Sequence, residues 1–175
     1  YGTSAQIGQS LGLMTTIAEL RRAKELATEY LRIPARFQRE VIDEFFARVE
    51  FAGPDAPAVL LLDTGVHAGH PLIDSALEAN DRHSVQADWG TGDDERQHGT
   101  GMAGIALYGD LSEAFARNGP IRLRHRLESA KILPPPPGSN RPEVFGYITE
   151  QGVARAIIAA PDRNRVICMA ITTDD

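Results

Sequence analysis

The first third of the chain has hydrophobic residues three or four positions apart, with charged residues between them. This spacing places the hydrophobic side chains on one face of a helix, so it predicts helices over residues 10–31 and 35–50. Ile33-Pro34 separates the two helices, because a proline disfavours the helical conformation at the residue before it.

A break at Gly53-Pro54-Asp55 ends this helical pattern, because glycine and proline interrupt both helices and strands. We therefore predict two regions, a helical N-terminal segment over residues 1–52 and a second region over residues 53–175. The N-terminal helices are expected to pack against the second region, or to form an arm that docks another domain.

After the break, short runs of consecutive hydrophobic residues alternate with helical patterns. The predicted strands are 59–63 (VLLLD), 121–133 and 165–171 (RVICMAI). The first and last of these runs have the composition of strands that are buried on both faces. The predicted helices are 70–79, 98–108 and 144–160. The predicted loops are the polar stretch 80–97 and the four prolines 134–137. The alternation is typical of the α/β class, a parallel sheet with helices on both faces.

Composition and charge exclude several classes of function. The net charge is −6 and the pI is near 5.4, which argues against a general nucleic-acid binder, because phosphate binding needs a basic surface. No apolar run approaches the roughly 20 residues of a membrane span, and no signal peptide is visible. The single cysteine, Cys168, cannot form an internal disulfide. We therefore expect neither a nucleic acid nor a membrane as a partner, and the cytoplasm is the favoured compartment.

The first candidate functional residue is Asp63, which directly follows a hydrophobic run as part of Asp63-Thr64-Gly65. In open α/β sheets, ligands and catalytic groups gather at the carboxyl ends of the strands. This short motif alone fits three interpretations. Asp63 could be a turn residue, one of the two paired aspartates of an acid protease, or an aspartate that orients a histidine.

The second candidate is His98, at the start of the glycine-rich helix QHGTGMAGI, residues 97–105. Three glycines in a helix cost about 2–3 kcal/mol relative to alanine, so such a helix needs a close neighbouring backbone or a ligand on that face. A neutral imidazole acts as a general base when a carboxylate holds its other nitrogen. Asp63 and His98 are therefore predicted to form such a pair.

The blocks that contain these residues resemble those of the subtilisin-like serine peptidases, over about residues 57–171. DTGV, HPLI at 70–73 and HGTGMAGI resemble the family patterns D-[ST]-G-[IV], H-P-x-[LI] and H-G-T-x-[VM]-A-[GS]-I. The resemblance implies that Asp63 is the orienting acid, that His98 is the general base, and that the substrate is a peptide or protein. The substrate-binding positions that it implies are Ala170, Ile171 and Thr172 on one side of the groove and Gly138, between Pro137 and Ser139, on the other.

The catalytic serine of this family follows the histidine in a G-T-S-x-[AM] block, and these 175 residues contain no such block after His98. The resemblance therefore implies a partial catalytic domain, with the remainder, which carries the serine, as its partner. Loss of the serine from such a unit can cost about 10⁶ in turnover, so we expect these residues alone to be inactive. Ser4, in Gly2-Thr3-Ser4, is an alternative nucleophile, although a helix N-cap also explains it. In a protease, residues 1–52 could also act as a pro-segment.

Four alternatives remain open at this point. An acid protease needs a second aspartate, and no second D-[ST]-G is present. A zinc site could use nitrogen and oxygen ligands from His67, His70, His98 and Asp63. The chain could also be a non-catalytic subtilase-like binding or scaffold domain, or an unrelated α/β domain. We expect no cofactor. Many subtilases bind calcium, but the acidic residues of the polar stretch have no calcium-loop spacing and are expected to form a solvated loop; they are Asp88, Asp93, Asp94 and Glu95.

Overall fold

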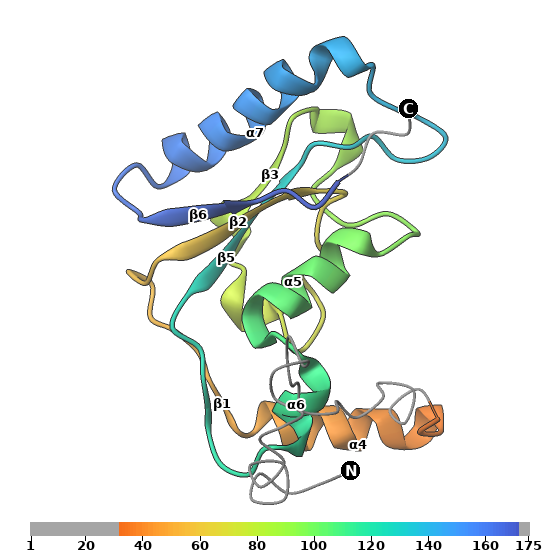
Figure 1. The fold of residues 1–175 in the computed structure, drawn as a ribbon, viewed down its shortest axis with the longest axis vertical. Coiled ribbons are helices and arrows are strands. Elements are labelled where there is room, and N and C mark those ends of the chain that lie inside the picture. Colours follow the sequence, from red (N-terminus) through yellow and green to blue (C-terminus); the bar gives the residue numbers. More distant parts are fainter. Residues whose placement is uncertain (1–31, 172–175) are drawn as a thin grey trace, which may run out of the picture.

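A four-stranded parallel sheet forms the centre of this computed structural model, which describes residues 32–171 (Figure 1). The strands lie in the order β3-β5-β2-β6, and all neighbours are parallel. Their bounds are Arg82–Ser84 for β3, Arg126–Lys131 for β5, Ala58–Asp63 for β2 and Arg165–Cys168 for β6. The predicted α/β class with a parallel sheet is confirmed.

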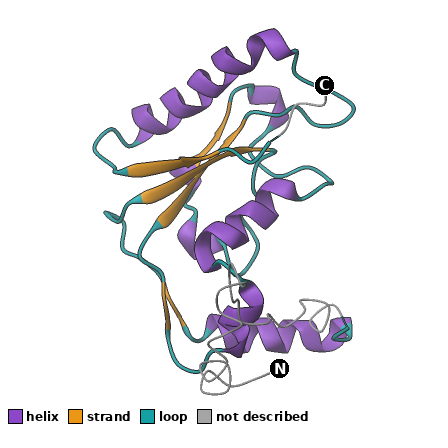
Figure 2. Ribbon diagram, in the orientation of Figure 1, coloured by secondary structure: helices purple, strands orange, loops and turns teal. Residues whose placement is uncertain are grey.

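Helices cover both faces of this sheet, as Figure 2 shows. Helix α5 (His98–Tyr108) packs on one face and helix α7 (Phe145–Ala159) on the other. Because successive side chains of a strand point to opposite faces, Leu61 of β2 joins the core under α5, whereas Leu60 and Leu62 join the core under α7. All three leucines are at most 1% exposed, so β2 is buried on both faces as predicted.

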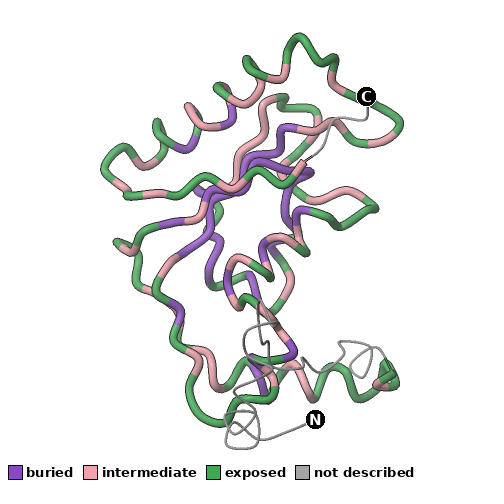
Figure 3. Tube along the Cα trace, in the orientation of Figure 1, coloured by how far each residue is buried: buried purple, intermediate pink, exposed green. Residues whose placement is uncertain are grey.

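Strand β6 differs from its prediction. The run RVICMAI was expected to be buried, yet Val166 is 68% exposed and Ile167 is 49% exposed. Figure 3 shows β6 as a segment of exposed and intermediate residues. Within the described residues β6 pairs only with β2, so its outer edge has no neighbouring strand. Only residues 165–168 of the run form the strand.

Two predicted elements are each divided in the structure. The predicted helix 35–50 ends at Phe46 as α4 (Ala35–Phe46), and Val49–Glu50 form the short strand β1. The predicted strand 121–133 is divided into β4 (Ile121–Arg122) and β5. Strands β1 and β4 pair in parallel, with Ile121 N–H donating to Arg48 O (2.8 Å). The pairing of β1 with β4 thus ends the predicted helix at Phe46 and separates β4 from β5, although the hydrophobic pattern of each segment continues.

Other short elements were not predicted. Strand β3 lies within the predicted loop 80–97, where it pairs with β5. The predicted helix 70–79 is replaced by two 3-10 turns, Asp74–Ala76 and Ala79–Asp81. Helix α6 (Leu111–Ala116) has Asp110 as its N-cap, and the Asp110 side chain accepts from Ser112 N. By contrast, α5 has the predicted bounds, and α7 lies within one residue of them.

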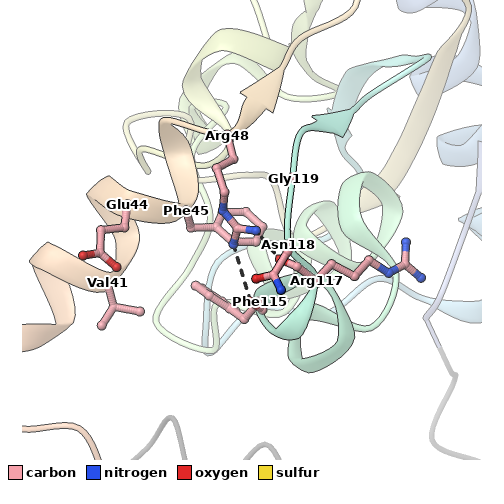
Figure 4. A pocket seen from close by; sticks show the side chains of 8 residues that line it. All are labelled: Val41, Glu44, Phe45, Arg48, Phe115, Arg117, Asn118 and Gly119. Carbon is pink, nitrogen blue, oxygen red and sulfur yellow. Dashed lines mark hydrogen bonds between the residues drawn. The ribbon is translucent and has the colours of Figure 1, made fainter.

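Helix α4 packs against α6 and the end of α5 through Phe45, which is 1% exposed. The ring of Phe45 lies 4.3 Å from the ring of Phe115 and 5.4 Å from that of Tyr108, measured between centroids. Beside these rings Arg48 lines a hollow and donates to the carbonyl oxygens of Phe115 and Arg117 at the end of α6 (Figure 4). The guanidinium therefore binds two backbone carbonyl groups at the C-terminal end of this helix.

The predicted helix 10–31 lies outside the described residues, and the division of the chain at residues 52 and 53 stays a prediction. None of the helices within residues 32–171 is long and apolar enough to cross a lipid bilayer.

A buried ion-pair cluster fixes the turn before β6 to the sheet. Glu128 of β5 accepts from Arg165 (2.8 and 3.0 Å) and from Arg163 (3.1 Å), and Arg163 also pairs with Asp81 (2.6 Å). The hydrogen bonds to Glu128 raise the pKa of Arg165 above its usual value. Because its charge is matched in this way, the Glu128 carboxylate can be almost wholly buried.

Two glycines of α7 give a matched test of how tightly this helix packs on the sheet. A Cβ at residue 152 would lie 2.9 Å from Ile132 Cγ2 and 3.2 Å from Leu62 Cδ2, whereas one at residue 146 would meet nothing within 4 Å. Gly152→Ala is therefore expected to destabilise the chain by about 1–3 kcal/mol through overpacking. Gly146→Ala is expected to stabilise it by up to about 1 kcal/mol. Urea denaturation measures both, and equal midpoints would contradict the packing.

Candidate active site

Asp63 ends strand β2 at the carboxyl edge of the sheet, and its side chain is only 3% exposed. The Thr64 N–H donates to Asp63 Oδ1 at 2.7 Å, which fixes the carboxylate at the turn. Because β2 is an interior strand of the sheet and is buried on both faces, the position of this carboxylate is set by a rigid part of the fold.

His98 is the first residue of α5, and its Nδ1 lies 2.8 Å from Asp63 Oδ1. This is the one hydrogen bond of the imidazole within residues 32–171. An ionised carboxylate can only accept a hydrogen bond, so the proton of a neutral His98 belongs on Nδ1 and Nε2 is left free to accept. The His98 side chain is 47% exposed. The pair thus has a buried acid and a base that is open to solvent.

Glycine is required where the chain carries these two residues toward each other. A Cβ at residue 99 would lie 2.0 Å from Gly65 O, and Gly65 itself has a φ of +96°. A Cβ at residue 65 would lie 2.4 Å from Gly92 O. Three backbone segments therefore pack with almost no space between them. The predicted close approach of another backbone to the glycine-rich helix is confirmed at Gly99.

A second carboxylate, that of Asp93, binds the residues next to the pair, Thr64 after Asp63 and Thr100 after His98. Its Oδ1 accepts from Thr64 Oγ1 (2.5 Å) and from Asp94 N (2.9 Å). Its Oδ2 accepts from Thr100 N (2.7 Å) and from Thr100 Oγ1. Asp93 lies in a loop as predicted, but the expectation that its carboxylate is only solvated is wrong, because it accepts from two of the segments that form the site.

A sequence comparison identifies the family of a chain with this geometry. Residues 55–175 match the family model of the subtilases. The chain belongs to the subtilase family. Searches of curated proteins and of solved structures returned no match.

Family membership, with the parallel sheet, decides between the interpretations of Asp63-Thr64-Gly65. The acid-protease and unrelated-domain hypotheses are wrong, since the matched region includes both the DTG and the HGT blocks of a subtilase. The chain is a partial subtilase-like domain of a serine-peptidase-related family.

The zinc alternative finds no support among the described residues, in which no group of three or more His, Cys, Asp or Glu side chains could hold a metal ion. His98 Nδ1 faces Asp63, and His70 Nδ1 lies 3.3 Å from Leu72 N, from which it accepts. The Nδ1 atoms of His98 and His70 are thus bound to different groups of the protein.

An apolar groove of about 260 Å³ runs along α5 from Gln97 to Tyr108 in this subtilase domain. Its lining includes Gly101, Gly104 and Tyr108, and the Tyr108 hydroxyl donates to Leu72 O at 2.6 Å. Burial raises the pKa of Tyr108, so this hydroxyl stays protonated. Burial also lowers the pKa of His70, the one imidazole in the lining, which keeps the groove uncharged near neutral pH.

The substrate-binding positions implied by the family resemblance lie after β5 and β6, at the same carboxyl edge as Asp63. Ala170 is exposed just beyond β6, and Ile171 packs against the core under α7. Gly138 is exposed in the proline loop after β5, where its N–H donates to Pro135 O (3.0 Å). Thr172 lies outside the described residues. No hydrogen bond of residues 32–171 joins these positions to His98, so their role stays a prediction.

Proposed function

We propose that this chain supplies the acid–base part of a subtilisin-like serine endopeptidase. Asp63 orients His98, and His98 is the general base for a serine that lies outside these residues. The observation that supports this proposal is the 2.8 Å contact between His98 Nδ1 and Asp63 Oδ1, at the positions of two subtilase catalytic blocks.

The geometry supports a definite sequence of proton movements. When the serine attacks a peptide carbonyl, its hydroxyl proton passes to His98 Nε2, the nitrogen that Asp63 leaves free. The imidazolium that forms is stabilised by the Asp63 carboxylate through the Nδ1–H, and Asp63 stays ionised. His98 then gives the same proton to the leaving amine, and the resulting acyl-serine is hydrolysed by water with His98 again as the base.

The substrate of this proposed enzyme is a peptide or protein chain. Residues 170–172 would lie beside it on one side and Gly138 on the other, as in the family resemblance. Residues 1–52 would pack on the domain, or act as a docking arm or a pro-segment. These roles are proposals that rest on position in the sequence.

Labelling by a fluorophosphonate, which modifies only an activated serine, tests the proposal. We expect the 175-residue chain to remain unlabelled and to hydrolyse no peptide. A protein that also contains the serine-bearing part of the domain is expected to be labelled and to cleave a casein substrate. Labelling of the 175-residue chain at Ser4 would contradict the proposal. A complete, folded protein that neither reacts nor cleaves would favour the non-catalytic binding or scaffold alternative.

A further inference from the structure

We infer that Asp93 is a positioning residue of the Asp63–His98 pair: its carboxylate fixes the loop after β2 to the first turn of α5, and so sets the contact between the acid and the base. This inference deepens the proposed function and rests on it for its catalytic consequence. Its structural part, the effect of Asp93 on the state of His98, can be measured in the chain itself.

The first support is that Asp93 replaces a missing helix cap. Gln97, the N-cap of α5, has a φ of +52° and makes no side-chain cap hydrogen bond. The Thr100 N–H, in the first turn, instead donates to Asp93 Oδ2 at 2.7 Å. A negative charge at this end of a helix is also favourable to the helix dipole. His98 belongs to the same first turn, so a group that fixes this turn also fixes the imidazole.

The second support is that Asp93 binds two threonine hydroxyls, each of which holds a backbone N–H. The Thr64 hydroxyl donates to Asp93 and accepts from Gly99 N (3.0 Å). The Thr100 hydroxyl donates to Asp93 and accepts from His67 N (3.0 Å). Each hydroxyl therefore connects the segment after β2 to the start of α5. One hydroxyl belongs to the first of these segments and the other to the second.

The proton of the Thr64 hydroxyl also matters for Asp63. This hydroxyl lies 2.5 Å from Asp93 Oδ1 but 3.2 Å from Asp63 Oδ1, and it has one proton to donate. The Thr64 hydroxyl therefore donates its hydrogen bond to Asp93 rather than to Asp63. The donors to Asp63 Oδ1 are then Thr64 N and His98 Nδ1.

An asparagine cannot reproduce these contacts in either orientation. Each carboxylate oxygen of Asp93 accepts from a backbone N–H, Asp94 N on Oδ1 and Thr100 N on Oδ2. Whichever way an Asn amide is placed, its NH₂ group would face one of these donors. The network therefore needs two acceptor oxygens, that is, the ionised carboxylate.

Nitrogen-15 NMR of the His98 ring in the 175-residue chain tests the inference, because it reports which nitrogen carries the proton. In the wild-type chain at a pH where His98 is neutral, we expect the Nδ1-protonated form to dominate. Asp93→Asn is expected to reduce it to a minority in a chain that remains folded by circular dichroism. Asp94→Asn is the matched control and should leave it unchanged, since the Asp94 carboxylate accepts only from Arg96 N (2.8 Å) among residues 32–171.

The catalytic consequence has a separate readout in the complete protein. Asp93 touches neither substrate nor serine in the proposed mechanism, so Asp93→Asn is expected to lower kcat by about 10²-fold through a misplaced base, with KM unchanged. If the complete protein has no peptidase activity at all, the proposed function fails while the NMR result still decides the role of Asp93.

An unchanged His98 tautomer in folded Asp93→Asn, or an equal loss in Asp94→Asn, would overturn the inference. Should Asp93→Asn fail to fold, Thr64→Val provides a second test. That variant removes the Thr64 hydroxyl link and keeps Asp93 bonded to Thr100. We expect it to lower the Nδ1-protonated fraction as well, and an unchanged fraction would equally contradict the positioning role.

Discussion

Replacement of His98 by alanine is expected to lower kcat by about 10⁶ in a protein that contains the whole catalytic domain. The imidazole is the only group in the proposed mechanism that takes the serine proton, and loss of the base from a Ser–His–Asp unit costs about as much as loss of the whole unit. Asp63→Ala should cost less, about 10⁴, because the imidazole remains but is no longer held in the tautomer that leaves Nε2 free. Initial rates on a chromogenic peptide measure both.

The difference between the two variants is itself informative. If Asp63 acts only through His98, the double variant should be no slower than His98→Ala alone, which is the non-additivity of residues that act as a unit. His125→Ala is a matched control. The His125 Nε2 contacts the carbonyl oxygen of Ala106, on the same helix but near its other end. The rate of the His125→Ala variant should therefore stay within about twofold of the wild-type rate. Equal losses in His98→Ala and His125→Ala would indicate unfolding rather than chemistry.

Much of the site could be predicted because its information is local in the sequence. The hydrophobic run before Asp63 predicts a buried strand, and the small residues after His98 predict a helix that another backbone approaches closely. Both expectations hold in the structure, at β2 and at Gly99. The chemistry of a carboxylate that orients an imidazole, together with the resemblance of both blocks to one family, then suggested the pairing of Asp63 with His98.

Asp93 could not be predicted in this way. It lies in a polar stretch with no periodicity, and its partner Thr64 is 29 residues away in the sequence. The Asp93 side chain becomes part of the site only because the folded loop places it beside Thr64 and the first turn of α5. Thr64 and Thr100 did carry a signal, because each belongs to one of the two family blocks, but a threonine hydroxyl does not reveal which acceptor it will find.

The short strands show the same limit. Strand β3 has three residues in a polar segment, and pairing with β5 rather than its own composition makes it a strand. Strand β6 has the composition of a buried strand, but which segment lies beside its outer edge is not a property of its own residues. Local pattern thus predicts the elements that bury their own side chains, and it fails where pairing with a distant segment decides.

Gly99→Ala is expected to have the largest effect on folding. The added methyl group would lie 2.0 Å from the carbonyl oxygen of Gly65 and 3.1 Å from Thr64 Oγ1. The first of these atoms belongs to a backbone that is itself packed against Gly92, so a simple side-chain rotation cannot relieve the clash. We expect a loss of at least about 3 kcal/mol, at the upper end of overpacking costs, measured as the free energy of unfolding in urea.

Gly101→Ala, two residues along the same helix, is the control for this prediction. A Cβ at residue 101 would meet nothing within 4 Å, so alanine should gain up to about 1 kcal/mol from its greater helix propensity. The two identical substitutions are thus expected to differ by at least about 3 kcal/mol, with opposite signs. Similar stabilities for the two variants would contradict the backbone contact at Gly65. That contact brings the turn after Asp63 against the start of α5. Similar stabilities would therefore also remove the structural reason for the short distance between Asp63 and His98.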